Sequence, residues 1–158
     1  MEKNTFLRLA NSRWRMRFFM LWKLPAAWFM GIRVHEIDAQ KAVTALPYGW
    51  RSQNPFKSVY FAAQCAAAEM STGLLAMYAM QGKAPVSMLV TEIRAEFYKK
   101  ASETLLFECR QGAEVAALVQ AALESAAPQM MTMRAMGRLP DGTVATLVEV
   151  TWSFRKKG

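Results

Sequence analysis

Alternating apolar and polar residues dominate the second half of the chain and predict antiparallel strands there. The alternation is clearest over residues 143–155, where Val148, Val150 and Trp152 share one face and Glu149 lies on the other. Side chains two positions apart point to the same face of a strand, so one face of this segment should be buried. Patterning and turn signals together predict six strands: 31–38, 41–49, 91–99, 104–110, 129–138 and 143–155.

Residues 58–81 form a long apolar stretch that predicts one buried helix. Between Lys57 and Lys83 the only charged residue is Glu69, and the stretch is rich in alanine and contains no proline. It is apolar on all sides, which is typical of a helix buried all round. A membrane-spanning helix is disfavoured, because Gln64 and Glu69 lie near the middle, where polar groups cost most.

The N-terminal segment, residues 1–25, combines basic and apolar residues and predicts an amphipathic helix over residues 4–23. Pro25 fits its end, because proline disfavours helical geometry in the residue before it. Two interpretations of the aromatic run WRMRFFMLW stay open. The helix packs its aromatic side on the domain or on a dimer partner, or it lies on a membrane surface with its basic residues toward the lipid headgroups.

The order of the predicted elements indicates the fold class. A further helix is expected over residues 113–125, so the chain reads helix, two strands, buried helix, two strands, helix, two strands. No internal repeat or low-complexity linker interrupts this order. We therefore expect one α+β domain over residues 1–158.

The formal net charge of +8 indicates which classes of partner the protein would attract. A basic protein attracts nucleic acid, an anionic membrane, or an acidic partner such as coenzyme A or acyl carrier protein, and the charge can also serve solubility alone. The chain has no helix-turn-helix spacing, zinc finger or RNA-binding aromatic motif. No nucleic-acid partner is therefore expected.

The few cysteines and histidines argue against metal chemistry. Cys65 and Cys109 each lie in an apolar stretch, no Cys-x-x-Cys pair is present, and His35 is the only histidine, so no zinc site is expected. Two buried free thiols are typical of a reducing compartment, and no cleavable signal peptide is evident. We expect a cytoplasmic protein that needs no cofactor.

The order of elements resembles the hotdog fold, in which an antiparallel sheet wraps around a long central helix. The resemblance runs over residues 26–156 and is carried by four segments. NPFKSVYFAAQCAAAE is similar to the loop and helix start of hotdog thioesterases, and AEFYKKASETLLFECRQG is similar to a strand-turn-strand signature of that superfamily. GAEVAALVQAALES is similar to a helical insertion of one thioesterase-like subgroup, and DGTVATLVEVTWSFRKK is similar to that subgroup's closing strand.

The resemblance implies an acyl-thioester hydrolase that acts on acyl-CoA or acyl carrier protein. It also implies a homodimer or a dimer of dimers, with a tunnel for the acyl chain beside the buried helix, between subunits. Where the thioesterase pattern usually has histidine and glycine, this chain has Tyr60 and Ala62. The backbone amide near Ala62 can still point at a thioester carbonyl, because helix N-termini present free N–H groups. Tyr60 would donate a phenolic hydrogen bond in place of the histidine, or it is a packed aromatic residue.

Glu69 is the leading candidate for the reacting group. Burial of a lone carboxylate disfavours its charged form and raises its pKa, and a raised pKa suits a general base. Glu69 would activate a water molecule or attack the thioester carbonyl directly. Alternatively it is structural, paired with an arginine at a dimer interface or reaching the sheet edge. Thr72, one turn after Glu69, would share its proton network.

The remaining candidates follow from their positions. Asn54 would orient the water or the carbonyl through its amide, or it is a turn residue before Pro55. Lys57, Lys99 and Lys100 would meet the phosphates of coenzyme A, or they are solvated charges. The alternative function is a non-catalytic hotdog module that binds acyl-CoA, a fatty acid or a membrane surface.

Overall fold

The computed structural model describes residues 2–157, which form five helices and six strands. The helices are α1 (Lys3–Ala10), α2 (Arg13–Lys23), α3 (Pro25–Phe29), α4 (Phe61–Met80) and α5 (Gly112–Glu124). The strands are β1 (Arg33–Ile37), β2 (Ala42–Leu46), β3 (Val86–Phe97), β4 (Leu105–Cys109), β5 (Gln129–Arg138) and β6 (Val144–Lys156). Each of the six predicted strands is present, and β5 has the predicted bounds.

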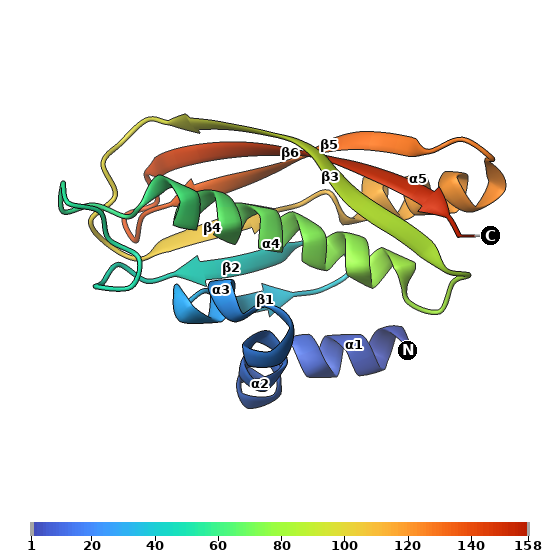
Figure 1. Ribbon diagram of the computed structural model, residues 1–158, viewed down its shortest axis with the longest axis horizontal. Helices are drawn as coiled ribbons and strands as arrows, with labels where there is room; N and C mark the ends of the chain where they lie inside the picture. Colours follow the sequence, from blue (N-terminus) through green and yellow to red (C-terminus); the bar gives the residue numbers. More distant parts are fainter. Residues whose placement is uncertain (1, 158) are drawn as a thin grey trace.

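The strands form one antiparallel sheet in the order β1-β2-β4-β5-β6-β3. Figure 1 shows α4 lying along this curved sheet, with β1 and β2 on one side of the helix in this view and β3 and β6 on the other. An antiparallel sheet curved around a long central helix is the hotdog arrangement. The predicted fold is therefore confirmed, with β1 and β3 as the two edge strands.

Small side chains let α4 pack closely against the sheet. Ala63 and Ala67 are buried, and Thr44 of β2 donates its hydroxyl hydrogen to the Ala67 carbonyl oxygen at 2.7 Å. The Gln64 side-chain oxygen accepts a hydrogen bond from the Thr146 hydroxyl of β6, so this buried amide is paired. None of the helices in the described part of the chain has the length and apolar character needed to span a bilayer.

The N-terminal segment forms two helices, α1 and α2, where the sequence predicted one, and the short helix α3 follows them. The break falls at Asn11 and Ser12. The Asn11 side chain donates a hydrogen bond to the Ile37 carbonyl oxygen at 2.9 Å and accepts one from the Ile37 N–H at 3.1 Å. These two bonds fix the corner to the end of β1. Pro25 starts α3, because proline suits the first turn of a helix.

Strand β3 begins at Val86, earlier than the predicted residue 91, and its alternation changes part-way. The register with β6 shifts between Val90 and Glu92, which is a bulge or irregularity. Before the shift Val86, Met88 and Val90 are half-buried and alternate with exposed residues. A bulge changes which residues face inward, so a single alternation of buried and exposed residues does not hold along the whole of β3.

Candidate active site

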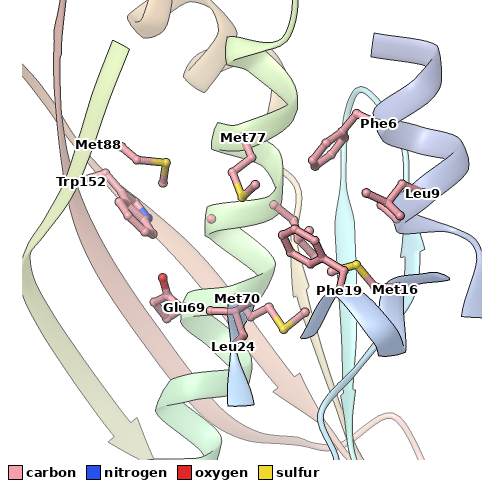
Figure 2. A pocket seen from close by; sticks show the side chains of 13 residues that line it. Phe6, Leu9, Met16, Phe19, Leu24, Glu69, Met70, Met77, Met88 and Trp152 are labelled. Carbon is pink, nitrogen blue, oxygen red and sulfur yellow. The ribbon is translucent and has the colours of Figure 1, made fainter. Parts of the chain in front are cut away.

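Glu69 lies in the wall of an apolar cavity of about 150 Å³ between α4 and the N-terminal helices (Figure 2). The other residues of the wall are uncharged and come from α1, α2, the link to α3, α4, β3 and β6. They are Phe6, Leu9, Ala10, Met16, Phe19, Leu24, Met70, Gly73, Leu74, Met77, Met88 and Trp152. Such a wall suits a hydrocarbon chain, with one carboxyl group at its side.

The Glu69 carboxyl has a raised pKa. Burial is the cause, because surroundings of low dielectric constant disfavour the charged form. Residues 2–157 supply this carboxylate with neither an ion pair nor a hydrogen bond. An arginine partner within this part of the chain is therefore not seen, and the carboxyl is free to interact with a molecule in the cavity.

Thr72 is connected to the backbone of Glu69 and to Trp152 of β6. Its hydroxyl donates a hydrogen bond to the Glu69 carbonyl oxygen at 2.8 Å and accepts one from the indole Nε1 of Trp152 at 2.9 Å. Thr72 thus holds the Trp152 ring, which Figure 2 shows beside Glu69. The proton network predicted between the two side chains has no direct bond here, because the hydroxyl reaches the main chain of Glu69.

Gly73 leaves space next to the carboxylate. It lies one turn after Glu69 in α4, and a Cβ atom placed there would be 3.5 Å from Glu69 Oε1 and 3.4 Å from the Trp152 ring. Any larger side chain would extend into the cavity between these two groups. The missing side chain therefore keeps one side of the carboxyl open.

A second, more open hollow meets the cavity at Glu69. This hollow has a volume of about 320 Å³ and lies between α3 and α4, and Leu24, Glu69 and Met70 line both spaces. A molecule that reached from the open hollow into the apolar cavity would pass the carboxyl. The open hollow is itself lined mostly by apolar residues, with Lys23 at its edge. An elongated ligand that spanned both spaces would therefore have Glu69 beside its middle.

Asn54, Lys99 and Lys100 line a different hollow, beside the start of α4. The Asn54 side-chain oxygen accepts hydrogen bonds from the N–H groups of Phe56 at 3.0 Å and Ser58 at 3.2 Å. This oxygen is occupied in closing the loop, as expected of a turn residue. Within one chain the structure does not bring Asn54 or the two lysines to the cavity that Glu69 lines.

Tyr60, Ala62 and Lys57 belong to the same helix start. Tyr60 precedes the first turn of α4 and is exposed, with its ring edge-on to Phe61 at 4.8 Å between ring centroids. Ala62 lies in the first turn, whose N–H groups have no partner within the helix. Lys57 is exposed in the preceding loop. At a rise of about 1.5 Å per residue, Ala62 and Glu69 are roughly 10 Å apart along α4.

The sequence reasoning missed Gly73 and Trp152 as members of the site. A signal for Gly73 was present, since a glycine inside a helix is unfavourable and calls for a packing or functional reason. Trp152 was placed on the correct, buried face of its strand, but only the fold brings it beside Glu69. No three side chains of the kind that bind metals come together within residues 2–157.

The sequence match to known proteins covers most of the chain. The family described as "Domain of unknown function (DUF4442)" matches residues 12–154. The chain belongs to the DUF4442 family. No curated protein matches this DUF4442 chain by sequence.

Solved structures resemble the DUF4442 chain along most of its length. A protein of unknown function from Chlorobaculum tepidum TLS is 15% identical with a TM-score of 0.77, and 90% of this chain and 93% of that chain are covered. A protein from Pseudomonas aeruginosa described as a probable thioesterase is 15% identical with a TM-score of 0.75, covering 94% and 99%. A thioesterase from Haemophilus influenzae is 11% identical with a TM-score of 0.67, covering 92% and 91%.

At these identities the likeness shows a shared fold. Thioesterase-family proteins are thus among the hotdog-fold neighbours of the DUF4442 chain, as the resemblance in its sequence predicted. What those proteins act on does not follow for this one.

Proposed function

We propose that this protein hydrolyses acyl thioesters, with acyl-CoA or acyl carrier protein as substrate and Glu69 as the reacting carboxylate. The observation that carries the proposal is a carboxyl with a raised pKa and no protein partner in the described chain, in the wall of an apolar cavity. An acyl chain would occupy the cavity, and the rest of the substrate would leave through the open hollow beside α3, past Lys23, toward solvent. The thioester group would then lie near Glu69.

Two routes are open to such a carboxylate. As a general base, Glu69 takes a proton from water while the water oxygen attacks the carbonyl carbon, the C–S bond breaks, and the proton passes to the departing sulfur. As a nucleophile, its oxygen attacks the carbonyl carbon and forms an anhydride, which water then hydrolyses. Both routes consume one water and release a carboxylic acid and a thiol. A raised pKa favours the first route, because it makes the carboxylate a stronger base.

The residues at the start of α4 fit a role toward the polar part of the substrate. Lys99 and Lys100 line a hollow there, and we propose that they and Lys57 attract the phosphates of coenzyme A or of the carrier's phosphopantetheine. Asn54, Tyr60 and the free amide near Ala62 would orient the thioester from a second subunit. In this proposal the site is shared between subunits, since one chain does not bring these groups to Glu69.

A homodimer, or a dimer of such dimers, is supported by the edge strand β3. It ends the sheet, and it exposes the large apolar side chains Leu89, Ile93 and Phe97. An edge strand with exposed apolar residues is a surface on which a second copy can pair. The two cysteines of the chain are free thiols, although Cys65 is only half-buried where burial was expected of both, and free thiols fit the cytoplasmic location that we propose.

A second candidate is a module that holds an acyl group without hydrolysing it. Tyr60 and Ala62, in the positions where the thioesterase pattern has histidine and glycine, favour this candidate. The apolar cavity would bind the acyl chain of acyl-CoA or of a fatty acid, and Glu69 would bind the carbonyl end as a protonated acid. The two candidates differ in turnover and in the protonation state of Glu69.

Thiol release from a series of acyl-CoAs, acetyl to stearoyl, tests the proposal. Wild type and Glu69→Gln are compared with Glu103→Gln, a matched control at an exposed glutamate in the loop between β3 and β4. We expect the loss of Glu69 to slow release by at least about 100-fold and the control to keep the wild-type rate. Equal rates for Glu69→Gln and wild type would overturn the role of Glu69. No release by folded wild type that still binds acyl-CoA would establish the binding module.

A further inference from the structure

Helix α2 carries a second apolar face, which points away from the protein. Trp14, Phe18 and Trp22 recur every four residues, so they lie on one side of the helix. Their side chains are 75%, 64% and 81% exposed, whereas Met16 and Met20 on the opposite side are buried. We call these three residues the aromatic stripe. Three large exposed aromatic side chains in a row are costly in water and indicate a surface that is covered in use.

Positive charge surrounds the aromatic stripe. Arg15 and Arg17 lie on its two sides, and the Arg17 guanidinium stacks over the Trp28 ring at 5.4 Å from the centroid. Residues 3–35 contain seven lysines and arginines and no aspartate or glutamate. Every ion pair found within residues 2–157 involves residues from Glu36 onward. The charge of this region is therefore not neutralised by neighbouring carboxylates.

A basic cleft of about 360 Å³ separates α2 from β1, on the flank of α2 that carries Arg13 and Arg17. Arg13, Arg17, Arg33 and His35 line it, and Arg17 belongs both to the cleft and to the border of the stripe. Asn11, also in its wall, is fixed by its two hydrogen bonds to the main chain of β1. Guanidinium groups suit phosphate because their planar N–H donors pair with its oxygens. The cleft has the charge and the donors for a phosphate headgroup.

We propose that α2 docks on an anionic lipid bilayer, with the aromatic stripe among the headgroups and a lipid phosphate in the basic cleft. Tryptophan and phenylalanine favour the membrane–water interface, and basic residues beside them attract anionic lipids. The opposite side of α2, with Met16 and Phe19, lines the Glu69 cavity, so the docked helix separates the bilayer from that cavity. The docking surface does not depend on thioester hydrolysis.

A second copy of the chain is a poorer occupant of this surface. In a twofold-symmetric interface the same patch meets itself, so the arginines of one copy would face those of the other. Residues 3–35 offer no carboxylate to compensate, so the like charges would repel and oppose the contact. An anionic bilayer supplies the negative charge that a second copy lacks.

Vesicle co-sedimentation with the full-length protein tests the aromatic stripe. We expect wild type to sediment with vesicles in which about a third of the lipid is phosphatidylglycerol and to stay in solution with pure phosphatidylcholine. The triple variant Trp14→Ser, Phe18→Ser, Trp22→Ser should bind at least about tenfold more weakly. Trp50→Ser with Phe56→Ser removes two equally exposed aromatics outside α2 and should bind as wild type.

The basic cleft has its own pair of variants. Arg13→Gln with Arg33→Gln should weaken binding to the anionic vesicles by about fivefold per charge removed. Arg155→Gln with Lys156→Gln removes the same charge from the opposite end of the chain and should have a smaller effect. Circular dichroism checks that every variant is folded. If the triple variant is not folded, Trp22→Ser alone, at the most exposed position of the stripe, takes its place in the sedimentation test.

Three results would overturn the docking surface. The first is wild type that stays in solution with anionic vesicles, whether or not it binds an acidic carrier protein or inorganic phosphate. The second is a folded stripe variant, triple or single, that sediments as strongly as wild type. The third is a change of mass by light scattering in the stripe variant, because that would make the stripe an interface between protein chains.

Discussion

The two faces of α4 differ in how closely they are packed. Toward the sheet, Ala67 is buried and its carbonyl oxygen accepts a hydrogen bond from Thr44. Toward the N-terminal helices, Glu69, Gly73 and Met77 border an open cavity. Helix α4 is thus closely packed on the sheet side and borders a cavity on the side of the N-terminal helices.

This difference separates stability from binding. Short alanine side chains on the sheet side let the backbones approach closely, and close packing fixes the helix. Flexible methionines and a glycine on the cavity side leave room for a ligand and can adapt to its shape. The Glu69 carboxyl on this side is half-buried and borders both the cavity and the more open hollow.

Truncation of one side chain on each face of α4 should give the largest difference in the free energy of unfolding. Leu75→Ala removes a fully buried side chain, and we expect it to lower the free energy of unfolding by about 2–5 kcal/mol. Met77→Ala enlarges a space that already exists around a half-buried side chain, so it should cost clearly less. Urea unfolding of both variants measures the two costs. Equal costs would show that the cavity side is packed as tightly as the core.

Addition of one methyl group should have opposite effects in the two environments. At Gly137 a Cβ atom would lie 2.6 Å from the Phe107 ring, so Gly137→Ala should cost about 1–3 kcal/mol of unfolding free energy. At Gly73 the nearest atom would be 3.4 Å away, and Gly73→Ala should gain up to about 1 kcal/mol from helix propensity. The added methyl at Gly73 should nevertheless slow acyl-CoA hydrolysis, because it narrows the space beside Glu69. A destabilised Gly73→Ala would mean that this space is already filled.

The hydrogen bond between Thr72 and Trp152 should contribute less to the free energy of unfolding than the packing of Leu75. Thr72→Val keeps the shape of the side chain but leaves the indole N–H of Trp152 without its acceptor, at a cost of about 1–2 kcal/mol. Thr72→Ser keeps the hydroxyl and serves as the control. Urea unfolding followed by tryptophan fluorescence measures both. The same stability for valine and serine would show that the bond contributes nothing.

The smallest effect expected is a pH dependence of stability from Glu69. Its folded-state pKa is raised, so between its ordinary pKa and the raised one the folded state keeps a proton that the unfolded state has lost. The free energy of unfolding from this group should therefore fall as the pH rises through that window. Glu69→Gln should lack this fall, and Glu103→Gln should keep it. Parallel pH profiles for wild type and Glu69→Gln would contradict the raised pKa.

The elements with a strong local pattern were predicted well from the sequence. The strand predicted over residues 129–138 has the bounds of β5, and the apolar run over residues 58–81 predicted α4, which begins a few residues later at Phe61. Glu69 stood out because a single charge in a buried helix is visible in the sequence. Its burial and raised pKa follow from that same pattern.

Features that depend on distant partners could not be predicted. The break between α1 and α2 is fixed by the bonds of Asn11 to Ile37, and no local signal shows that contact. The placement of Trp152 beside Gly73 depends on how β6 lies against α4. Asn54 was grouped with Glu69 by resemblance, and in the single chain the two line separate spaces.

The pH dependence of acyl-CoA hydrolysis tests most directly whether Glu69 is the reacting carboxylate. If it acts in its ionised form with a raised pKa, kcat/KM should be low at acidic pH and rise through a pKa above the ordinary glutamate value. The rise should be absent from the residual activity of Glu69→Gln and present in Glu103→Gln. A rise at the ordinary glutamate pKa, or an unchanged profile in Glu69→Gln, would contradict the role of Glu69.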